Sequence, residues 1–220
     1  MGATGLPIGL WFQVERVLNY LFDTAIYERA NTVMSLGVHR LLRNIVLSSV
    51  AGRVLDVGCG DGVYVPQLVQ TAEEVVCIDP IATKNTHNYA NFHRVVAAAE
   101  CIPFRARSFD FAIAMFSFRD FMDKALGIFN MRKASRKGVF ILDLFAISRF
   151  LLPAVVLYFG YIAPILGFIV SGGRRGRWEL LIPTLQLMPR ADFFTKLGGK
   201  VLIKKGLGLV AVIYIPPETR

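Results

Sequence analysis

The chain has 220 residues, of which 54% are hydrophobic and 19% are charged, so it is long enough for one α/β core and too short for two ordinary domains. Its 25 basic and 16 acidic residues give a net charge of +9, which attracts phosphates on nucleic acid or on anionic lipid without choosing between them. The mean hydropathy of +0.49 exceeds that of an ordinary soluble domain but is far below that of a bundle of membrane spans.

The first residues and the cysteines indicate a cytoplasmic protein. The opening MGATGLPIGLWFQ has neither the charged start nor the continuous apolar centre of a signal peptide, and Leu6 stands where a myristoylation signal has serine or threonine. Cys59, Cys77 and Cys101 form no CxxC pair, so we predict neither a disulfide framework nor a metal site. A reducing compartment is expected.

Helices and strands alternate along the chain. Apolar residues recur at helical spacing over residues 11–27, and a second helix is predicted over 38–49. RVLDVG and EVVCIDP are predicted buried strands on either side of the helical segment GVYVPQLVQTA. FDFAIAMFSF and GVFILDLF are two further strands around a helix over 124–133, and GGKVLIKKGLGLVAVIYIP is a hairpin around its GLG turn. This order predicts an α/β fold with a doubly wound, mostly parallel sheet and a C-terminal antiparallel hairpin.

The segment VLDVGCGDG places Gly58, Cys59, Gly60 and Gly62 directly after the first predicted strand. Glycines there let a ligand approach the backbone, and ligands of open α/β sheets bind beyond the carboxyl ends of the strands. The spacing excludes the GxGxxG of a dinucleotide site, because Val63 takes its last position, and a phosphate loop would need Gly-Lys-Ser or Gly-Lys-Thr. The pattern DxGxGxG resembles motif one of the class I S-adenosylmethionine-dependent methyltransferases, whose loop wraps the aminocarboxypropyl arm of the cofactor.

Two carboxylates accompany this loop. Asp79, followed by Pro80, comes 17 residues after Gly62, close to the spacing of about 20 residues at which a carboxylate meets the cofactor ribose. Two roles are considered for Asp56, namely contact with the cofactor and orientation of the loop. The alternative is that the glycines make only a tight turn and that Asp79 only begins another.

Two further segments, YERANTVMSLGVHR and AECIPFRARSFDFAIAMFSFRDFMDKALGIF, carry a narrower resemblance. They are similar to signatures of the ubiquinone and menaquinone biosynthesis C-methyltransferases, and the similarity runs from about residue 22 to the C-terminus, fading after residue 145. The matching positions are Tyr27, Asn31, Met34, Ser35, Gly37, His39, Glu100, Pro103, Phe104, Ser108, Phe109, Asp110 and Arg119. The resemblance implies S-adenosylmethionine as the cofactor and a lipophilic quinol as the methyl acceptor.

The same resemblance assigns catalytic roles. Arg119 is expected to stabilise the phenolate of the quinol or to organise a water that takes its proton, and Tyr27 to hydrogen-bond the same oxygen. Asp120 stands where the family has asparagine and is the candidate base, while Ser117 replaces a glycine. The alternatives are that Arg119 pairs with Asp120 or Asp123 on the surface and that Tyr27 is a packing residue.

Adenine recognition departs from the family pattern. Ala98 replaces the polar residue that commonly contacts adenine, so the backbone at Ala99 and Glu100 is expected to serve instead. His39 is interpreted as a packing or capping histidine.

The segment FLLPAVVLYFGYIAPILGFIV has 21 residues without a charge, and about 20 suffice to span a bilayer. We expect no span, because the strand before it and the hairpin after it should join one sheet, and Pro153 and Pro164 should interrupt any helix. A hydrophobic cover over the acceptor pocket is expected instead, with Arg174, Arg175 and Arg177 facing anionic headgroups. A homodimer interface or plain core is the alternative. Nucleic acid is not expected, because no recognition helix accompanies these arginines.

Together these observations predict a Rossmann-like methyltransferase fold in one domain, residues 1–220. Its parts are the N-terminal helices (11–50), the cofactor-binding core (51–145), the apolar lid (146–190) and the hairpin (191–220). The predicted function is C-methylation of a membrane-resident quinol by a cytoplasmic, peripherally membrane-associated enzyme. The rivals are a methyltransferase for another lipid-like acceptor and a non-catalytic scaffold with a cofactor fold.

Overall fold

A computed structural model describes residues 5–24, 26–83, 87–145, 152–173, 177, 180–189 and 191–218. Its strands form one sheet in the order β3-β2-β1-β4-β5-β7-β6. They are β1 (Gly52–Val57), β2 (Ala72–Asp79), β3 (Phe92–Val96), β4 (Phe109–Met115), β5 (Ser135–Leu144), β6 (Lys200–Lys205) and β7 (Val210–Ile215). Strands β1 to β5 are parallel, and β7 runs antiparallel between β5 and β6. The predicted mostly parallel sheet with a C-terminal antiparallel hairpin is confirmed.

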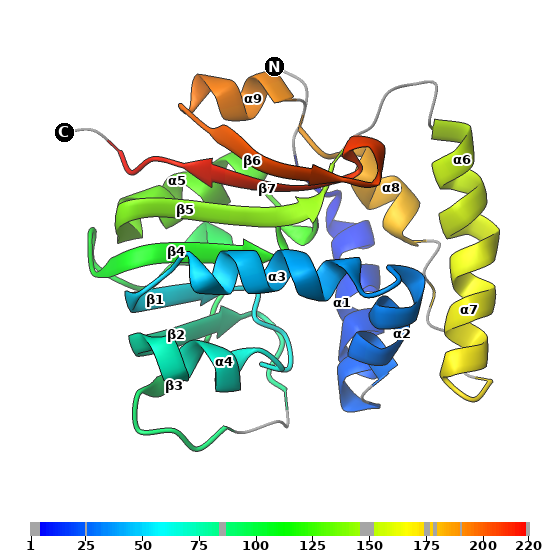
Figure 1. Ribbon diagram of the computed structural model, residues 1–220, viewed down its shortest axis with the longest axis horizontal. Helices are drawn as coiled ribbons and strands as arrows, with labels where there is room; N and C mark the ends of the chain where they lie inside the picture. The colour runs from blue at the N-terminus through cyan, green and yellow to red at the C-terminus, as the bar shows by residue number, and fades with distance from the viewer. Residues whose placement is uncertain are drawn as a thin grey trace.

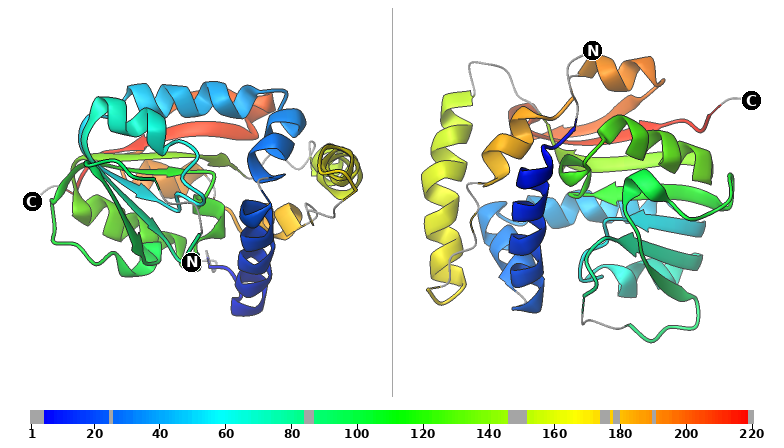
Figure 2. Two further views of the ribbon diagram at one scale, coloured as in Figure 1. Left: turned by 90° about the horizontal axis from the view of Figure 1, so that it is seen from below. Right: turned by 180° about the vertical axis from the view of Figure 1, so that it is seen from behind.

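Helices cover both faces of the sheet and its carboxyl edge. They are α1 (Ile8–Asp23), α2 (Ile26–Met34), α3 (Val38–Ser48), α4 (Val65–Thr71), α5 (Lys124–Ala134), α6 (Leu152–Leu157), α7 (Ala163–Val170), α8 (Leu181–Gln186) and α9 (Ala191–Lys196). Figure 1 shows α3 and α4 over one face, and Figure 2 shows α5 on the other. Both figures place α1, α2 and α7 beyond the carboxyl ends of the parallel strands. This is the edge where an open α/β sheet binds its ligands.

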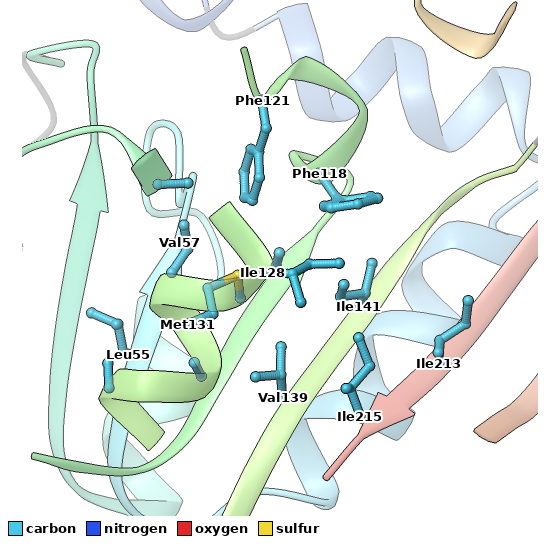
Figure 3. Close-up of a cluster of buried hydrophobic side chains, with 14 of the residues drawn as sticks. Leu55, Val57, Phe118, Phe121, Ile128, Met131, Val139, Ile141, Ile213 and Ile215 are labelled. Carbon is cyan, nitrogen blue, oxygen red and sulfur yellow. The ribbon is translucent and has the colours of Figure 1, made fainter. Parts of the chain in front are cut away.

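The two faces of the sheet each bury an apolar cluster, because successive side chains of a strand point to opposite faces. Leu55 and Val57 of β1 face α5, where they meet Met131, whereas Val54 faces α3 and α4. Figure 3 shows the α5 cluster, with strand side chains on one side and the helix on the other. Asp123 begins α5 by accepting hydrogen bonds from the backbone N–H groups of the first turn.

The apolar segment forms a helix that its prolines do not interrupt, which corrects the expectation for Pro153 and Pro164. Residues Leu152–Val170 form one helix of 19 residues, which by length and composition alone is sufficient to cross a membrane. Pro153 lies in the first turn, where its missing N–H is not needed. Pro164 follows the π-helical turn η3 (Tyr158–Ile162), whose wider turn accommodates the proline ring.

The strands on either side of this helix belong to one sheet, as expected, because β5 precedes it and pairs with β7. One face of the helix packs on α2 and α8 through Phe159 and Ala163. Only 17% of its most apolar stretch is buried. Arg174 and Arg175 of the expected basic loop, and residues 146–151 of the expected lid, lie outside the described residues.

The cysteines differ from the sequence prediction. Cys59 in the glycine loop and Cys77 in β2 form a disulfide, with their Cα atoms 5.8 Å apart. The two residues are 18 apart in sequence, but β1 and β2 are adjacent parallel strands, so the loop after β1 lies beside the end of β2. Cys101 is free and exposed.

Candidate active site

The glycine loop after β1 has a backbone conformation and close neighbours that leave no room for side chains. Gly58, Gly60 and Gly62 have φ angles of 75°, 58° and 74°, a region that glycine adopts without strain. A Cβ atom on Gly58 would lie 2.3 Å from the Cβ of Ser117, and one on Gly60 would lie 2.8 Å from the ring of Phe22. The loop therefore makes close contacts that require bare backbone.

Asp79 fixes this loop from the end of β2. Its carboxylate is buried and accepts one hydrogen bond of 2.8 Å from the Gly60 N–H and another of 2.8 Å from the Ile81 N–H. Burial raises the pKa of Asp79. Arg94 of β3 donates to the Gly60 carbonyl at 2.8 Å, a contact that sequence analysis missed. The structure shows the carboxylate of Asp79 holding the loop, and its contact with a ribose stays a prediction.

A cavity with about 970 Å³ of empty space, part of it open to solvent, lies against the loop. Predicted cofactor residues in its wall are Asp56, Gly58, Cys59, Gly60, Asp79, Pro80, Ala99 and Glu100. Gly62 faces away from it, toward Arg94 and His87.

Helix α1 forms part of the wall of this first cavity, which the sequence did not predict. Five of its side chains contribute to the wall, namely Trp11, Val14, Glu15, Leu18 and Phe22. At the floor of the cavity, burial raises the pKa of Asp56 to about 7, against the opposing effect of the Arg43 charge. Burial therefore favours the protonated form of Asp56 more than water would.

Arg119 is buried. The ion pair with Asp120 that was considered as the alternative is present, but it is not on the surface. Its Nη1 atom lies 2.9 Å from Asp143 Oδ1, and its backbone N–H donates to Asp143 Oδ2 at 2.9 Å. Its Nε atom lies 3.7 Å from Asp120 Oδ1. These two carboxylates raise the pKa of Arg119 above its ordinary value, although burial opposes this. Asp123, the other expected partner, caps α5 instead.

Asp143 was missed because it ends an apolar strand and carries no motif. It is fully buried at the end of β5, and the only sequence signal was a single carboxylate within GVFILDLF. A buried carboxylate requires a charged partner, and Arg119 supplies it.

Asp120 is a buried carboxylate that lines two cavities. It lines the first cavity and a smaller one between α1, η2 (Phe118–Asp120) and α8. Burial raises its pKa to about 6, and the neighbouring Arg119 charge opposes this rise without cancelling it. Lys124, fully buried in the first turn of α5, is a further nearby positive charge.

A second large cavity, with about 1,110 Å³ of empty space, lies between α2, the π-helical turn η3 and the turn between β6 and β7. Five matching positions of the first signature line it, namely Tyr27, Asn31, Met34, Ser35 and His39. Tyr158 and Phe159 of η3 also line it, so part of the predicted hydrophobic cover lies over this cavity. Tyr27 is buried, as a packing residue would be, but it also lines the three cavities described here, as a ligand-binding residue would.

A hydrogen-bond network behind the cavities was also missed. Glu28 of α2 accepts at Oε1 from Tyr64 Oη at 2.7 Å and lies 2.9 Å from His39 Nε2. Burial raises the pKa of Glu28, but hydrogen bonds from His39 and Tyr64 and the Arg43 charge outweigh it and hold the pKa at about 2. His39 also lies 2.8 Å from Ser35 Oγ, and its packing or capping role stays a prediction.

Phe116 is the remaining residue that sequence analysis missed. It follows β4, has a φ angle of 62°, and lines both large cavities. A positive φ on an aromatic residue is costly, and such residues are concentrated at functional sites.

Within the part of the chain that the structure describes, no group of three or more His, Cys, Asp or Glu side chains has a metal-binding arrangement.

The fold and the glycine loop define the class of protein. Residues 55–142 match the family model described as a methyltransferase domain. A putative methyltransferase from an antibiotic biosynthesis pathway of Anabaena variabilis superposes with a TM-score of 0.53 at 17% identity, over 74% of this chain and 63% of that one. A putative type 11 methyltransferase from Sulfolobus solfataricus superposes with a TM-score of 0.50 at 18% identity, over 80% of this chain and 89% of that one. These two similarities concern the fold alone. The chain is a methyltransferase of the S-adenosylmethionine-dependent class.

Curated relatives narrow the resemblance further. The ubiquinone/menaquinone biosynthesis C-methyltransferase of Wigglesworthia glossinidia brevipalpis is 26% identical over 190 residues, covering 78% of this chain and 76% of that protein. The enzyme of the same name from Geobacter sp. (strain M21) is 26% identical over 217 residues, covering 86% of this chain and 90% of that protein. The chain is thus similar over most of its length to enzymes named for quinone biosynthesis.

Proposed function

We propose that the protein transfers a methyl group from S-adenosylmethionine to a ring carbon of a membrane-resident quinol. The observation that carries this proposal is the junction of two cavities. A cavity beside the glycine loop and a larger, mainly apolar one share Tyr27, Arg43 and Phe116 in their walls. A donor and a lipophilic acceptor bound there would meet at these residues, with Arg119 and Asp120 beside them.

The first cavity fits the cofactor. The glycine loop leaves space that Cβ atoms would fill, and carboxylates at its edge suit hydroxyl groups of a ribose. Asp79 and the loop backbone would hold the cofactor, with Ala99 and Glu100 beside its adenine. When bound, S-adenosylmethionine supplies a methyl group on a positively charged sulfur.

The residues at the junction would act on the acceptor. A quinol carbon becomes nucleophilic when its neighbouring hydroxyl loses a proton, and Asp120 would accept that proton. The donor would leave as neutral S-adenosylhomocysteine, and the methylated ring carbon would then lose its own hydrogen as a proton, which restores the aromatic quinol. Arg119 would stabilise the phenolate, since a guanidinium held in place by Asp143 needs no reorganisation as charge develops. Tyr27 would donate to the same oxygen. Helix α1 lines the first cavity and the turn η3 lines the second, and their apolar side chains would help to exclude water.

The proposed base predicts a pH dependence. Asp120 must be deprotonated to accept a proton, so kcat should be constant above its pKa of about 6 and fall tenfold for each pH unit below it. In Asp120→Asn we expect kcat to fall by about 10²-fold and this acidic limb to disappear. Initial rates from pH 5 to 8 test this. An Asp120→Asn variant with the full rate and the same profile would instead leave deprotonation to water organised by Arg119.

We further propose that the protein is cytoplasmic and binds membranes peripherally through the helix formed by α6, η3 and α7. Large apolar side chains are exposed along it, with Tyr161, Ile165 and Ile169 each at least 60% exposed. The second cavity is lined by the same helix, so an acceptor with a hydrocarbon tail would enter from the lipid side. The surplus of positive charge favours an anionic leaflet.

Replacing Ile165 and Ile169 together by glutamate should reduce sedimentation with anionic liposomes several-fold, because each exposed side chain would lose its burial in lipid. The matched control is Val96→Glu, an apolar side chain of similar exposure on β3 at the far edge of the sheet. Unchanged sedimentation of the double variant would refute the membrane surface. Loss of a dimer in the double variant, seen by light scattering, would assign the surface to a second copy of the chain.

A defined assay tests the reaction itself. Purified protein with S-adenosylmethionine and a short-tailed demethylated naphthoquinone or benzoquinone should produce C-methylated product only when a reductant supplies the quinol, because the oxidised ring is not nucleophilic. Methylation of an amine of phosphatidylethanolamine in the same assay would favour another lipid acceptor. Cofactor binding without any turnover would favour the scaffold.

A further inference from the structure

The first cavity has a marked imbalance of charge. Of the described residues in its wall, six are acidic and one is basic. The acidic residues are Glu15, Asp56, Asp61, Asp79, Glu100 and Asp120, and the basic residue is Arg43. S-adenosylmethionine carries a positive sulfonium, a positive ammonium and a negative carboxylate. The acidic side chains of the wall would attract the two positive groups of the cofactor. Its negative carboxylate has only one basic side chain among the described residues of the wall, that of Arg43.

Arg43 is built into the wall of the cavity. It extends from α3, its side chain is 6% exposed, and its guanidinium lies 4.2 Å from the ring centre of Tyr64 and 5.1 Å from that of Phe116. Its Nη1 atom is 3.8 Å from Glu28 Oε2, which is an ion-pair distance and too long for a hydrogen bond. A side chain clamped between two rings keeps one orientation.

The Nε atom of Arg43 is buried and has no hydrogen-bond partner in the structure. A buried N–H without a partner is costly, and more so on a charged group. A ligand that supplies an acceptor in the cavity would remove this cost, and a carboxylate matches the planar donor pattern of a guanidinium.

Arg94 is the other arginine near the loop, but it lies on the opposite side. Its Nη1 atom donates to the Gly60 carbonyl, and its Nη2 atom lies close to Gly62, which does not face the cavity. Arg94 therefore supports the loop without lining the cavity, whereas Arg43 lines the cavity.

We propose that Arg43 binds the carboxylate of the cofactor and thereby selects donors that carry the intact amino-acid arm. This rests on the proposed function in one respect, the identity of the cofactor. The acidic wall alone would accept any cationic adenosyl sulfonium, so Arg43 is the residue that distinguishes S-adenosylmethionine from its decarboxylated analogue.

Calorimetry without acceptor tests this with two ligands, S-adenosylmethionine and decarboxylated S-adenosylmethionine. The wild type should bind the first at least tenfold more tightly. In Arg43→Gln the affinity for S-adenosylmethionine should fall about 10- to 100-fold, while that for the decarboxylated analogue stays within twofold. Arg40→Gln is the matched control, because Arg40 is on the same helix and also contacts Glu28 but lines none of the three cavities described above. Both affinities should be unchanged.

An equal loss of both affinities in Arg43→Gln would overturn the proposal and make Arg43 a support for Tyr64 and Glu28 only. The ratio of the two affinities does not depend on the folded fraction, and the wild-type ratio needs no variant. A wild type that binds both ligands equally would therefore refute the role of Arg43 and leave the proposed reaction intact. A wild type that binds neither ligand would refute both.

Discussion

Gly58→Ala is expected to reduce the affinity for S-adenosylmethionine by more than about 100-fold. An added Cβ would lie 2.3 Å from the Cβ of Ser117 and 2.6 Å from its Oγ. The Ser117 side chain donates a hydrogen bond of 2.7 Å from Oγ to the Val57 carbonyl, and a movement away from the added Cβ would break this bond. The loop must shift instead, and the cavity it lines changes shape. Calorimetric titration measures the loss, with thermal unfolding as a check on the fold.

Gly37→Ala separates the two contributions to this effect. Gly37 has a φ angle of 77°, nearly that of Gly58, but a Cβ there would meet no atom within 4 Å. It should therefore show only the cost of the left-handed backbone, about 1–2 kcal/mol of stability, with little change in cofactor affinity. Equal affinities in the Gly58 and Gly37 variants would show that the loop does not shape the cofactor site.

Arg119→Met is the second substitution with a large expected effect. It removes the partner of Asp143, which is fully buried, and an uncompensated buried carboxylate costs roughly 3–5 kcal/mol of stability. If Arg119 also stabilises the phenolate, kcat should fall by about 10²- to 10³-fold. Denaturant unfolding and steady-state rates measure the two effects.

A double variant separates stability from catalysis. Arg119→Met combined with Asp143→Leu removes both charges, and the replacement of a buried ion pair by apolar residues is often neutral for stability. We expect this variant to recover most of the stability and none of the activity. Recovery of both would make Arg119 a structural residue, and the catalytic assignment would be withdrawn.

The parts of the fold that bury apolar strands were predictable from the sequence. RVLDVG, EVVCIDP, FDFAIAMFSF and GVFILDLF correspond to β1, β2, β4 and β5, since strands covered on both faces are nearly continuous apolar runs. The glycine loop was predictable because its spacing reflects a backbone requirement. The strand β3, with the sequence FHRVV, was not, because it lies at the edge of the sheet and is only partly buried.

The partners of the site residues were less predictable, because long-range contacts leave no local pattern. Asp143 pairs with Arg119 across 24 residues, and Glu28 accepts a hydrogen bond from Tyr64 across 36. The continuous helix through Pro164 depends on a π-helical turn that periodicity does not indicate. Helix α1 was expected, but its amphipathic pattern did not reveal that it would line the first cavity.

Transfer of radiolabelled methyl from S-adenosylmethionine to a total lipid extract of the organism that makes the protein would test the central claim most directly. The extract offers every acceptor at once, and mass spectrometry identifies the labelled product. We predict label on a ring carbon of a quinone, recovered only when the extract is reduced. Label on a phospholipid or an isoprenoid, with the quinones unlabelled, would contradict the proposed acceptor.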